Sequence, residues 1–178
     1  MTDRPLRADA RRNQERIIEV ATEVFAQDGA GASFEEIARR SGVGSGTLYR
    51  RFPTRGSLFE AVYAEQAEHL LEPRPDDPDP WRALETWLRR FVDFIIGKRA
   101  FAEEMAHDTD LVRDVRRRIY ATADPLVEAA QTAGVVPDDV TADDILRMLS
   151  GIGLADYPAP GQLDRVVGIS LRGLRRTA

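Results

Sequence analysis

Apolar residues recur three or four positions apart along most of this chain, which is the period of an α-helix with one buried face. The first such stretch covers residues 10–27, and its predicted buried stripe is Ile17, Ala21, Val24 and Phe25. Another covers 55–71, with Leu58, Phe59, Val62 and Tyr63 on its apolar face. Residues 1–9 carry no apolar stripe and are predicted to form a flexible basic arm.

The same period continues in the second half of the chain. It predicts helices over 81–97, 101–105, 111–133, 143–151 and 162–175, with an interruption or kink near Pro125. A proline-rich and aspartate-rich stretch at 72–80 separates them from the earlier helices and reads as a surface linker. No run of alternating residues predicts a strand, so we expect an all-α protein of about nine helices.

Between these stretches lies the segment 33–55, which reads SFEEIARRSGVGSGTLYRRFPTR. Ser33 is a suitable N-cap, and Glu36 three positions later completes the pattern of a capping box. Two glycines around Val43 predict a turn, and a second short helix is expected over 45–52. Thr54 is a suitable N-cap for the helix that follows. The segment therefore predicts two short helices joined by a tight turn.

The second short helix has distinct faces. Leu48 and Phe52 lie four positions apart and are expected to point inward, which places Gly46 and Arg50 on the outer face. Such a face suits the DNA major groove, because glycine permits close approach and arginine can reach a guanine edge. The alternative is an ordinary helical hairpin with solvated arginines.

The motifs FEEIA at 34–38, GV at 42–43, GTLY at 46–49 and FPTR at 52–55 together resemble the DNA-binding domain of the TetR (tetracycline repressor) family. The resemblance covers roughly residues 12–71. It implies a helix-turn-helix head over 10–56, a fourth helix that leads out of it, and a ligand-binding and dimerisation body over 57–178. The head core is then expected to contain Val24, Phe25, Phe34, Ile37, Val43, Leu48 and Phe52.

The resemblance also assigns roles to individual residues. Arg50 and Thr47, with Ser45 as a third candidate, are expected to read bases, while Tyr49, Arg51 and Arg55 hold the backbone and Gly46 allows close approach. The chain has Gly44 and Ser45 where family members often have serine and lysine. We therefore expect Arg50, Arg51 and Arg55 to supply most of the contacts.

Composition supports a protein without disulfides that acts in the cytoplasm. The chain has 178 residues, no cysteine and a formal net charge of −5, and its N-terminus lacks an apolar signal core. Its charge is uneven: the first 60 residues carry ten basic and nine acidic side chains, whereas the rest carry fifteen and twenty-one. The relatively basic end coincides with the predicted head.

Two sets of residues in the body have candidate roles. An apolar ligand pocket is implied by the resemblance, and the aromatic and sulfur side chains that would line it are Trp87, Phe91, Phe94, Met105 and Tyr120. Large aromatic residues at helical spacing are also typical of a plain core. The last two helices offer a dimer interface, for which monomer core is the alternative; its residues are Ile145, Leu149, Ile152, Leu163, Val167, Leu171 and Leu174.

No catalytic set, cofactor motif or metal site is predicted, and His107 beside Asp108 is better explained by a surface turn. We therefore expect a homodimeric repressor that binds a palindromic operator in double-stranded DNA and leaves it when a small apolar effector binds. A transcriptional activator of the same family is the main alternative. An enzyme and a ligand-independent DNA-binding protein are weaker ones.

Overall fold

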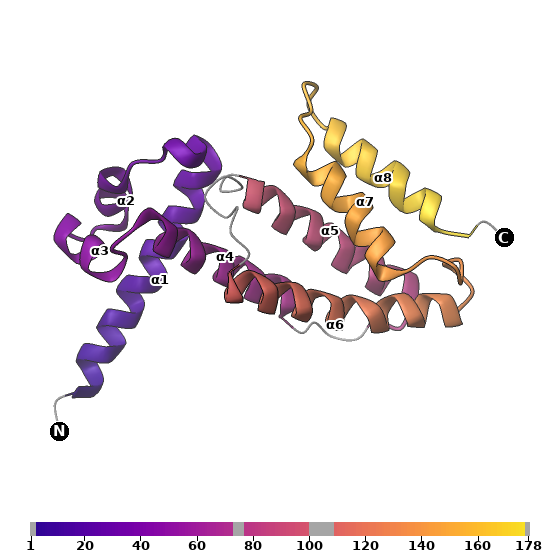
Figure 1. Cartoon of the computed structure of the whole chain (residues 1–178), viewed down its shortest axis with the longest axis horizontal. Helices are drawn as coiled ribbons and strands as arrows, with labels where there is room; N and C mark the ends of the chain where they lie inside the picture. Colours follow the sequence, from indigo (N-terminus) through magenta and orange to yellow (C-terminus); the bar gives the residue numbers. More distant parts are fainter. Residues whose placement is uncertain (1–2, 73–76, 100–108, 177–178) are drawn as a thin grey trace. The chain divides into compact units, whose positions relative to one another are not determined.

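The computed structural model describes residues 3–72, 77–99 and 109–176. Within these ranges the regular secondary structure is helical and contains no strand (Figure 1). The helices are α1 (Asp3–Asp28), α2 (Phe34–Ser41), α3 (Ser45–Arg51), α4 (Arg55–Leu71), α5 (Pro80–Arg99), α6 (Asp110–Thr132), α7 (Ala142–Leu154) and α8 (Gln162–Leu174), with a 3₁₀ turn, η1, over Gly29–Gly31. The fold class is therefore confirmed, with eight α-helices described. The helix predicted over 101–105 lies outside the described residues.

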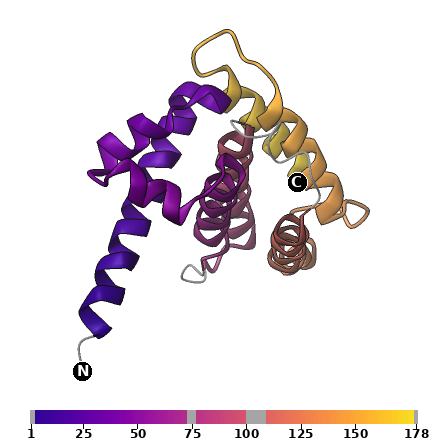
Figure 2. The same cartoon turned by 60° about the vertical axis from the view of Figure 1, so that its left-hand side comes forward.

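Helix α1 begins earlier than the sequence pattern predicted. It starts at Asp3, so most of the segment predicted as a flexible arm is helical, and α1 extends well past α2 and α3 in both views (Figures 1 and 2). Pro5 is compatible with this start, because the first turn of a helix needs no backbone N–H donors. Ion pairs between side chains one turn apart, Arg12 with Asp9 and Arg11 with Glu15, support the turns that follow.

The N-terminal helices enclose one hydrophobic core. All the head residues predicted to be buried are buried except Val43, which is half-buried and still packs against the cluster. The cluster also contains three residues of α4, namely Leu58, Phe59 and Val62. The rings of Phe25 and Phe59 lie 4.4 Å apart between centroids. The first half of α4 therefore packs as part of the head.

This packing places the division between the two compact units of the chain. One unit runs through α1–α3 and into α4 as far as Gln66; the other begins at Ala67 and holds the rest of α4, α5 up to Ile96, and α6–α8. The division falls inside α4, after the boundary at residue 56 that the sequence suggested. Helix α4 is thus a continuous element shared by both units.

In the second unit α7 lies side by side with α6 and with α8 (Figures 1 and 2). Helix α6 continues through Pro125 without a break. Thr141 begins α7 with a complete capping box, in which Asp144 accepts from the Thr141 backbone N–H at 2.9 Å. Gly153 of α7 packs against Ile95 of α5, where an added Cβ would lie only 2.8 Å from the Ile95 Cγ2 atom. Within the described ranges, no helix is long and apolar enough to cross a membrane.

Candidate nucleic-acid interface

The turn between α2 and α3 is fixed by backbone hydrogen bonds and one glycine. Gly42 has a φ of +69°, a conformation that glycine adopts without steric cost. The Gly42 N–H donates to the Arg39 carbonyl at 3.3 Å and the Val43 N–H to the Ala38 carbonyl at 3.1 Å, which is the Schellman pattern of a helix C-terminus. Ser41 is buried and donates to the Ile37 carbonyl at 2.7 Å. The angle between the two short helices is therefore set by local bonds.

The start of α2 differs in one detail from its prediction. Ser33 is the N-cap, as expected, and its hydroxyl accepts from the Glu36 backbone N–H at 3.4 Å. The Glu36 carboxylate, however, binds the guanidinium of Arg39 at 2.6 and 2.8 Å. An arginine one turn ahead on an exposed helix competes with the backbone for this carboxylate. The reciprocal half of the predicted capping box is thus replaced by an ion pair.

Helix α3 presents the faces that the sequence predicted. Leu48 is fully buried, while Gly46 and Arg50 are exposed on the opposite side. Gly44 is the N-cap in extended conformation and offers no side-chain hydrogen bond, and Ser45 is exposed beside it. Within the described residues, the Arg50 side chain makes no hydrogen bond or ion pair. It is therefore the cation of α3 that can reach a partner without first breaking a contact.

One flank of α3 is tied to α2. The Tyr49 hydroxyl donates to the Glu35 carboxylate at 3.2 Å, and its ring lies 5.4 Å from that of Phe34. Hydrogen bonds from Ser33, from the backbone and from Tyr49 lower the pKa of Glu35. Tyr49 is still 45% exposed. Its hydroxyl, predicted to hold the DNA backbone, is already used to fix the two short helices to each other.

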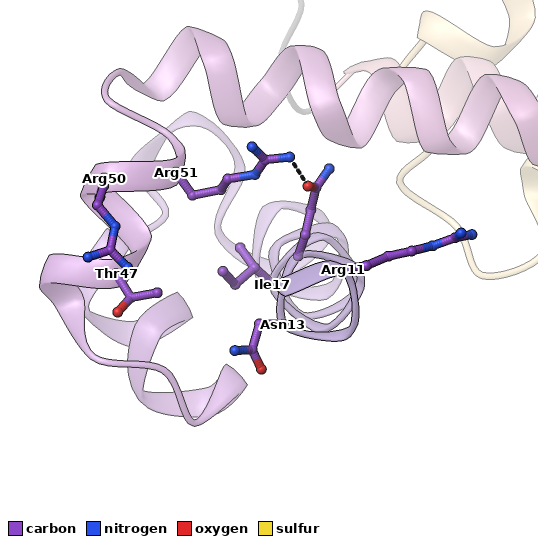
Figure 3. Close-up of a pocket in the computed structure, with 7 residues that line it drawn as sticks. Arg11, Asn13, Ile17, Thr47, Arg50 and Arg51 are labelled. Atoms are coloured by element: carbon purple, nitrogen blue, oxygen red, sulfur yellow. Dashed lines mark hydrogen bonds between the residues drawn. The ribbon is translucent and has the colours of Figure 1, made fainter. Parts of the chain in front are cut away.

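The other flank of α3 faces α1 across a surface hollow. This feature, which we call the α1–α3 hollow, has a volume of about 520 Å³ and is lined from α1 by Arg11, Asn13, Gln14 and Ile17 and from α3 by Thr47, Arg50 and Arg51 (Figure 3). Arg51 donates to the side-chain oxygen of Gln14, so the guanidinium is held against α1. Sequence reasoning assigned no role to Asn13 or Gln14. Their position one turn before Ile17 on the buried stripe was the available signal, because it places them on the face of α1 that turns toward α3.

Arg55 begins α4 and lies between two aromatic rings. Its guanidinium carbon is 5.7 Å from the ring centroid of Phe34 and 5.8 Å from that of Phe59, within the range of a cation–π contact. Thr54 caps this helix, as predicted: its hydroxyl accepts from the Ser57 backbone N–H at 3.0 Å. The ring contacts orient a positive charge at the N-terminus of α4.

The residues predicted to line a ligand pocket are placed as follows. Trp87, Phe91 and Phe94 are buried on α5, with the first two rings stacked at 5.9 Å. The indole N–H of Trp87 has no hydrogen-bond acceptor among the described residues. Tyr120 instead uses its hydroxyl to donate to Asp143 of α7 at 2.5 Å. Met105 lies outside the described residues.

The residues predicted to form a dimer interface fall into two groups. Ile145 and Leu149 of α7 and Val167, Leu171 and Leu174 of α8 are buried within the single chain. Their place in a dimer interface stays a prediction. Ile152 and Leu163 are half-buried. The apolar side chains that these helices leave exposed are Met148 at 39%, Leu154 at 47% and Ile169 at 60%.

The fold and the exposed face of α3 define a helix-turn-helix protein. Comparison with known sequences gives its family. Residues 17–62 match the model of the tetR family of bacterial regulatory proteins, and residues 79–176 match the C-terminal domain of SbtR-like transcriptional regulators. The chain therefore belongs to the TetR family, a family of DNA-binding transcriptional regulators rather than enzymes.

Two solved structures and one sequence relative support this family assignment. The TetR transcriptional regulator SCO0520 from Streptomyces coelicolor is 37% identical, with a TM-score of 0.75 over 93% of this chain and 99% of its own. A TetR regulator from Mycobacterium vanbaalenii is 34% identical, with a TM-score of 0.69 over 97% of this chain and 100% of its own. An HTH-type transcriptional regulator from Staphylococcus aureus is 28% identical over 120 residues, and the match spans 65% of each chain.

Proposed function

We propose that this protein is a homodimeric repressor that places α3 of each subunit in the DNA major groove and leaves its operator when a small ligand binds the body. The observation that carries the DNA-reading part is the division of α3 into a buried Leu48 and an exposed face of Gly46 and Arg50. A two-fold dimer would bind half-sites separated by about one or two turns of DNA.

Selection of genomic DNA fragments by the purified protein tests this function directly. We expect enrichment of a palindromic sequence whose half-site spacing matches a dimer. Recovery of fragments without a shared motif would contradict sequence-specific binding. The position of the enriched sites relative to promoters, combined with a reporter assay, would distinguish repression from activation.

Replacing Arg50 by alanine should relax sequence preference. The Arg50 side chain is exposed and without a partner in the described chain, so it is available for a bidentate contact to a guanine edge. Loss of such a contact would reduce the binding free energy by about 1–3 kcal/mol. We expect operator affinity to fall by that amount while affinity for random DNA changes less. Fluorescence anisotropy with both duplexes measures the ratio, and an equal loss on both would contradict base reading by Arg50.

Arg55→Ala provides the comparison for that variant. A guanidinium at the start of α4 is suited to a backbone phosphate, so its loss should weaken operator and random DNA by similar factors. The slope of log K against log salt should also decrease by about one. Because Arg55 contacts the rings of Phe34 and Phe59, the thermal midpoint must be measured beside the binding curves.

The proposed dimer would form through the exposed sides of α7 and α8. Met148 and Ile169 leave an apolar surface on neighbouring helices, and a second copy of the chain would bury the same residues across a two-fold axis. The stripe of Ile145, Leu149, Val167 and Leu171 would then support these helices from within the subunit. Its residues would not themselves touch the partner.

The proposed effector site is in the body near α5. Stacked Trp87 and Phe91 supply an apolar aromatic surface, and the buried indole N–H of Trp87 is a donor without an acceptor among the residues that the structure describes. A buried donor without a partner costs roughly 1–3 kcal/mol, which a ligand acceptor would recover. These features support an apolar ligand that carries at least one hydrogen-bond acceptor.

The ligand preference can be tested with Trp87 as its own reporter. The chain contains two tryptophans, so in the Trp81→Phe variant all tryptophan fluorescence comes from Trp87. We expect compounds that combine an apolar body with an acceptor to shift this emission and release DNA. In Trp87→Phe, which keeps the aromatic packing and removes the N–H, their affinity should fall about ten-fold. Unchanged release of DNA from that variant would contradict the role of the indole.

Contacts on α4 supply a route from the body to the head. Glu68 near the end of α4 forms two hydrogen bonds to Arg118 of α6, at 2.5 and 2.9 Å, and Arg90 of α5 donates to the backbone carbonyl of His69. The Arg118 guanidinium lowers the pKa of Glu68, which keeps this pair charged. A ligand that moves α5 or α6 would therefore also move α4, which carries core residues of the head.

A further inference from the structure

We propose that the α1–α3 hollow is a binding site for a phosphate group, formed by α1 together with α3. One source of that phosphate is the backbone of DNA, and this source rests on the proposed function. It adds Asn13 and Gln14 of α1 to the contacts.

The chemistry of the lining favours an anion. Its polar groups are three arginines, two primary amides and one hydroxyl, with no carboxylate among the described lining residues. Guanidinium groups donate only, and amides and hydroxyls can donate as well. The side chain of Arg11 runs away from Arg50 and Thr47 in Figure 3 and is paired with Glu15 at 2.8 Å. Among the described lining residues no acid neutralises Arg51, whose guanidinium is held by the uncharged Gln14 side chain.

The hydrogen bond between Arg51 and Gln14 prepares the site. It uses the Gln14 side-chain oxygen and one N–H of Arg51, so the Gln14 amino group and the other guanidinium N–H groups remain to donate to an anion. It also holds both long side chains across the hollow before any ligand arrives, which reduces the entropy lost on binding. Ile17, which is 1% exposed, anchors the floor to the head core.

The remaining donors lie around the same opening. Figure 3 places Asn13 on the α1 side and Thr47 and Arg50 on the α3 side. Within the part of the chain that the structure describes, the Asn13 side chain makes no hydrogen bond. The volume of about 520 Å³ exceeds that of a phosphate group and leaves space for the sugars on either side of it. A backbone strand passing beside α3 could therefore place one phosphate here.

The test uses operator duplexes recovered by genomic selection, each with one backbone phosphate replaced by an uncharged methylphosphonate. For wild-type protein, we expect one position per half-site at which the replacement weakens binding about ten-fold, the size of one hydrogen bond to a charged group. When the phosphate at that position is replaced, the Asn13→Ala and Gln14→Ala variants should lose much less affinity than wild type does, because the substitution has already removed their contact to it. Gln27→Ala, a glutamine on α1 outside the hollow, is the matched control and should behave as wild type.

A second measurement distinguishes DNA phosphate from free phosphate. Inorganic phosphate is titrated against chloride at constant ionic strength while the side-chain amide signals of Asn13 and Gln14 are followed by NMR. Saturable shifts of these signals, together with loss of DNA binding and no methylphosphonate coupling, would identify the site as one for free phosphate. If instead the effects of the amino-acid substitutions and of the methylphosphonate are non-additive at one DNA position, the bound group is a backbone phosphate of DNA.

The proposal is overturned if neither measurement responds. Equal methylphosphonate profiles for wild type, Asn13→Ala and Gln14→Ala, together with unsaturable amide shifts, would show that the hollow binds no phosphate. If genomic selection yields no operator, the proposed function fails, and the NMR titration still decides the phosphate site. Thermal midpoints within about 2 °C of wild type confirm that the substitutions at Asn13, Gln14 and Gln27 leave the head folded.

Discussion

Phe59→Ala is expected to destabilise the head by about 3–5 kcal/mol, the range for truncating a buried phenylalanine. The side chain is fully buried, its ring lies 4.4 Å from that of Phe25, and it also supports the Arg55 guanidinium at 5.8 Å. The substitution leaves a cavity where α1 and α4 meet. Urea denaturation should show the loss, and DNA binding should fall with the fraction of folded head.

The neighbouring residue supplies the control for this substitution. Glu60 lies on the same helix and is exposed, so Glu60→Ala should change stability by no more than about 0.5 kcal/mol. If Phe59→Ala lost only that much, the first half of α4 would not be part of the head core. Hydrogen exchange of α1–α3 in the variant would locate the loss, with protection lowered in the head before the body.

Ile169→Arg is expected to convert the proposed dimer to a monomer. Ile169 is 60% exposed on α8, and the substitution would place an unpaired charge on each side of a two-fold apolar interface. The cost of burying such a charge is about 3–5 kcal/mol, which weakens association by roughly 100-fold or more. Analytical ultracentrifugation measures the change, and operator affinity should fall because the two half-sites would be bound separately.

Two further variants make this result specific to the interface. Ile169→Leu keeps an apolar surface and should remain dimeric, while Leu149→Ala removes a fully buried side chain and should lower the thermal midpoint instead. A dimeric Ile169→Arg protein would mean that association uses another surface. A variant that loses its helical circular dichroism would instead show that Ile169 is needed for the fold of α8.

The sequence predicted the head closely because local signals determine it. Ser33 and Thr54 cap their helices, Gly42 ends α2, and the apolar stripes are buried as expected. Each depends on residues a few positions apart, which a single sequence displays. The start of α1 was less predictable, because the polar N-terminal turns of α1 have no apolar stripe to mark them as helical.

The side chains of the candidate sites are positioned by contacts between residues far apart in the sequence, which the sequence does not display. Nothing near Tyr49 in the sequence indicates that Glu35 accepts from its hydroxyl, nor does the surrounding sequence pair Arg51 with Gln14. Helical period also cannot tell which of two neighbours an apolar stripe faces. For that reason the sequence pattern of Leu149 and Leu171, which are buried within the single chain, fits a dimer interface and a monomer core equally well.

The position of the division inside α4 limits how parts of this protein can be exchanged with those of relatives. A DNA-binding module cut at residue 56 would lack Leu58, Phe59 and Val62 of its own core. A chimaera joined there would pair a head with a foreign half-helix and would have to repack that core. A junction that keeps the head core intact must fall after Gln66, where the division between the two units lies. Helices α1–α3 and the first half of α4 would then be exchanged together.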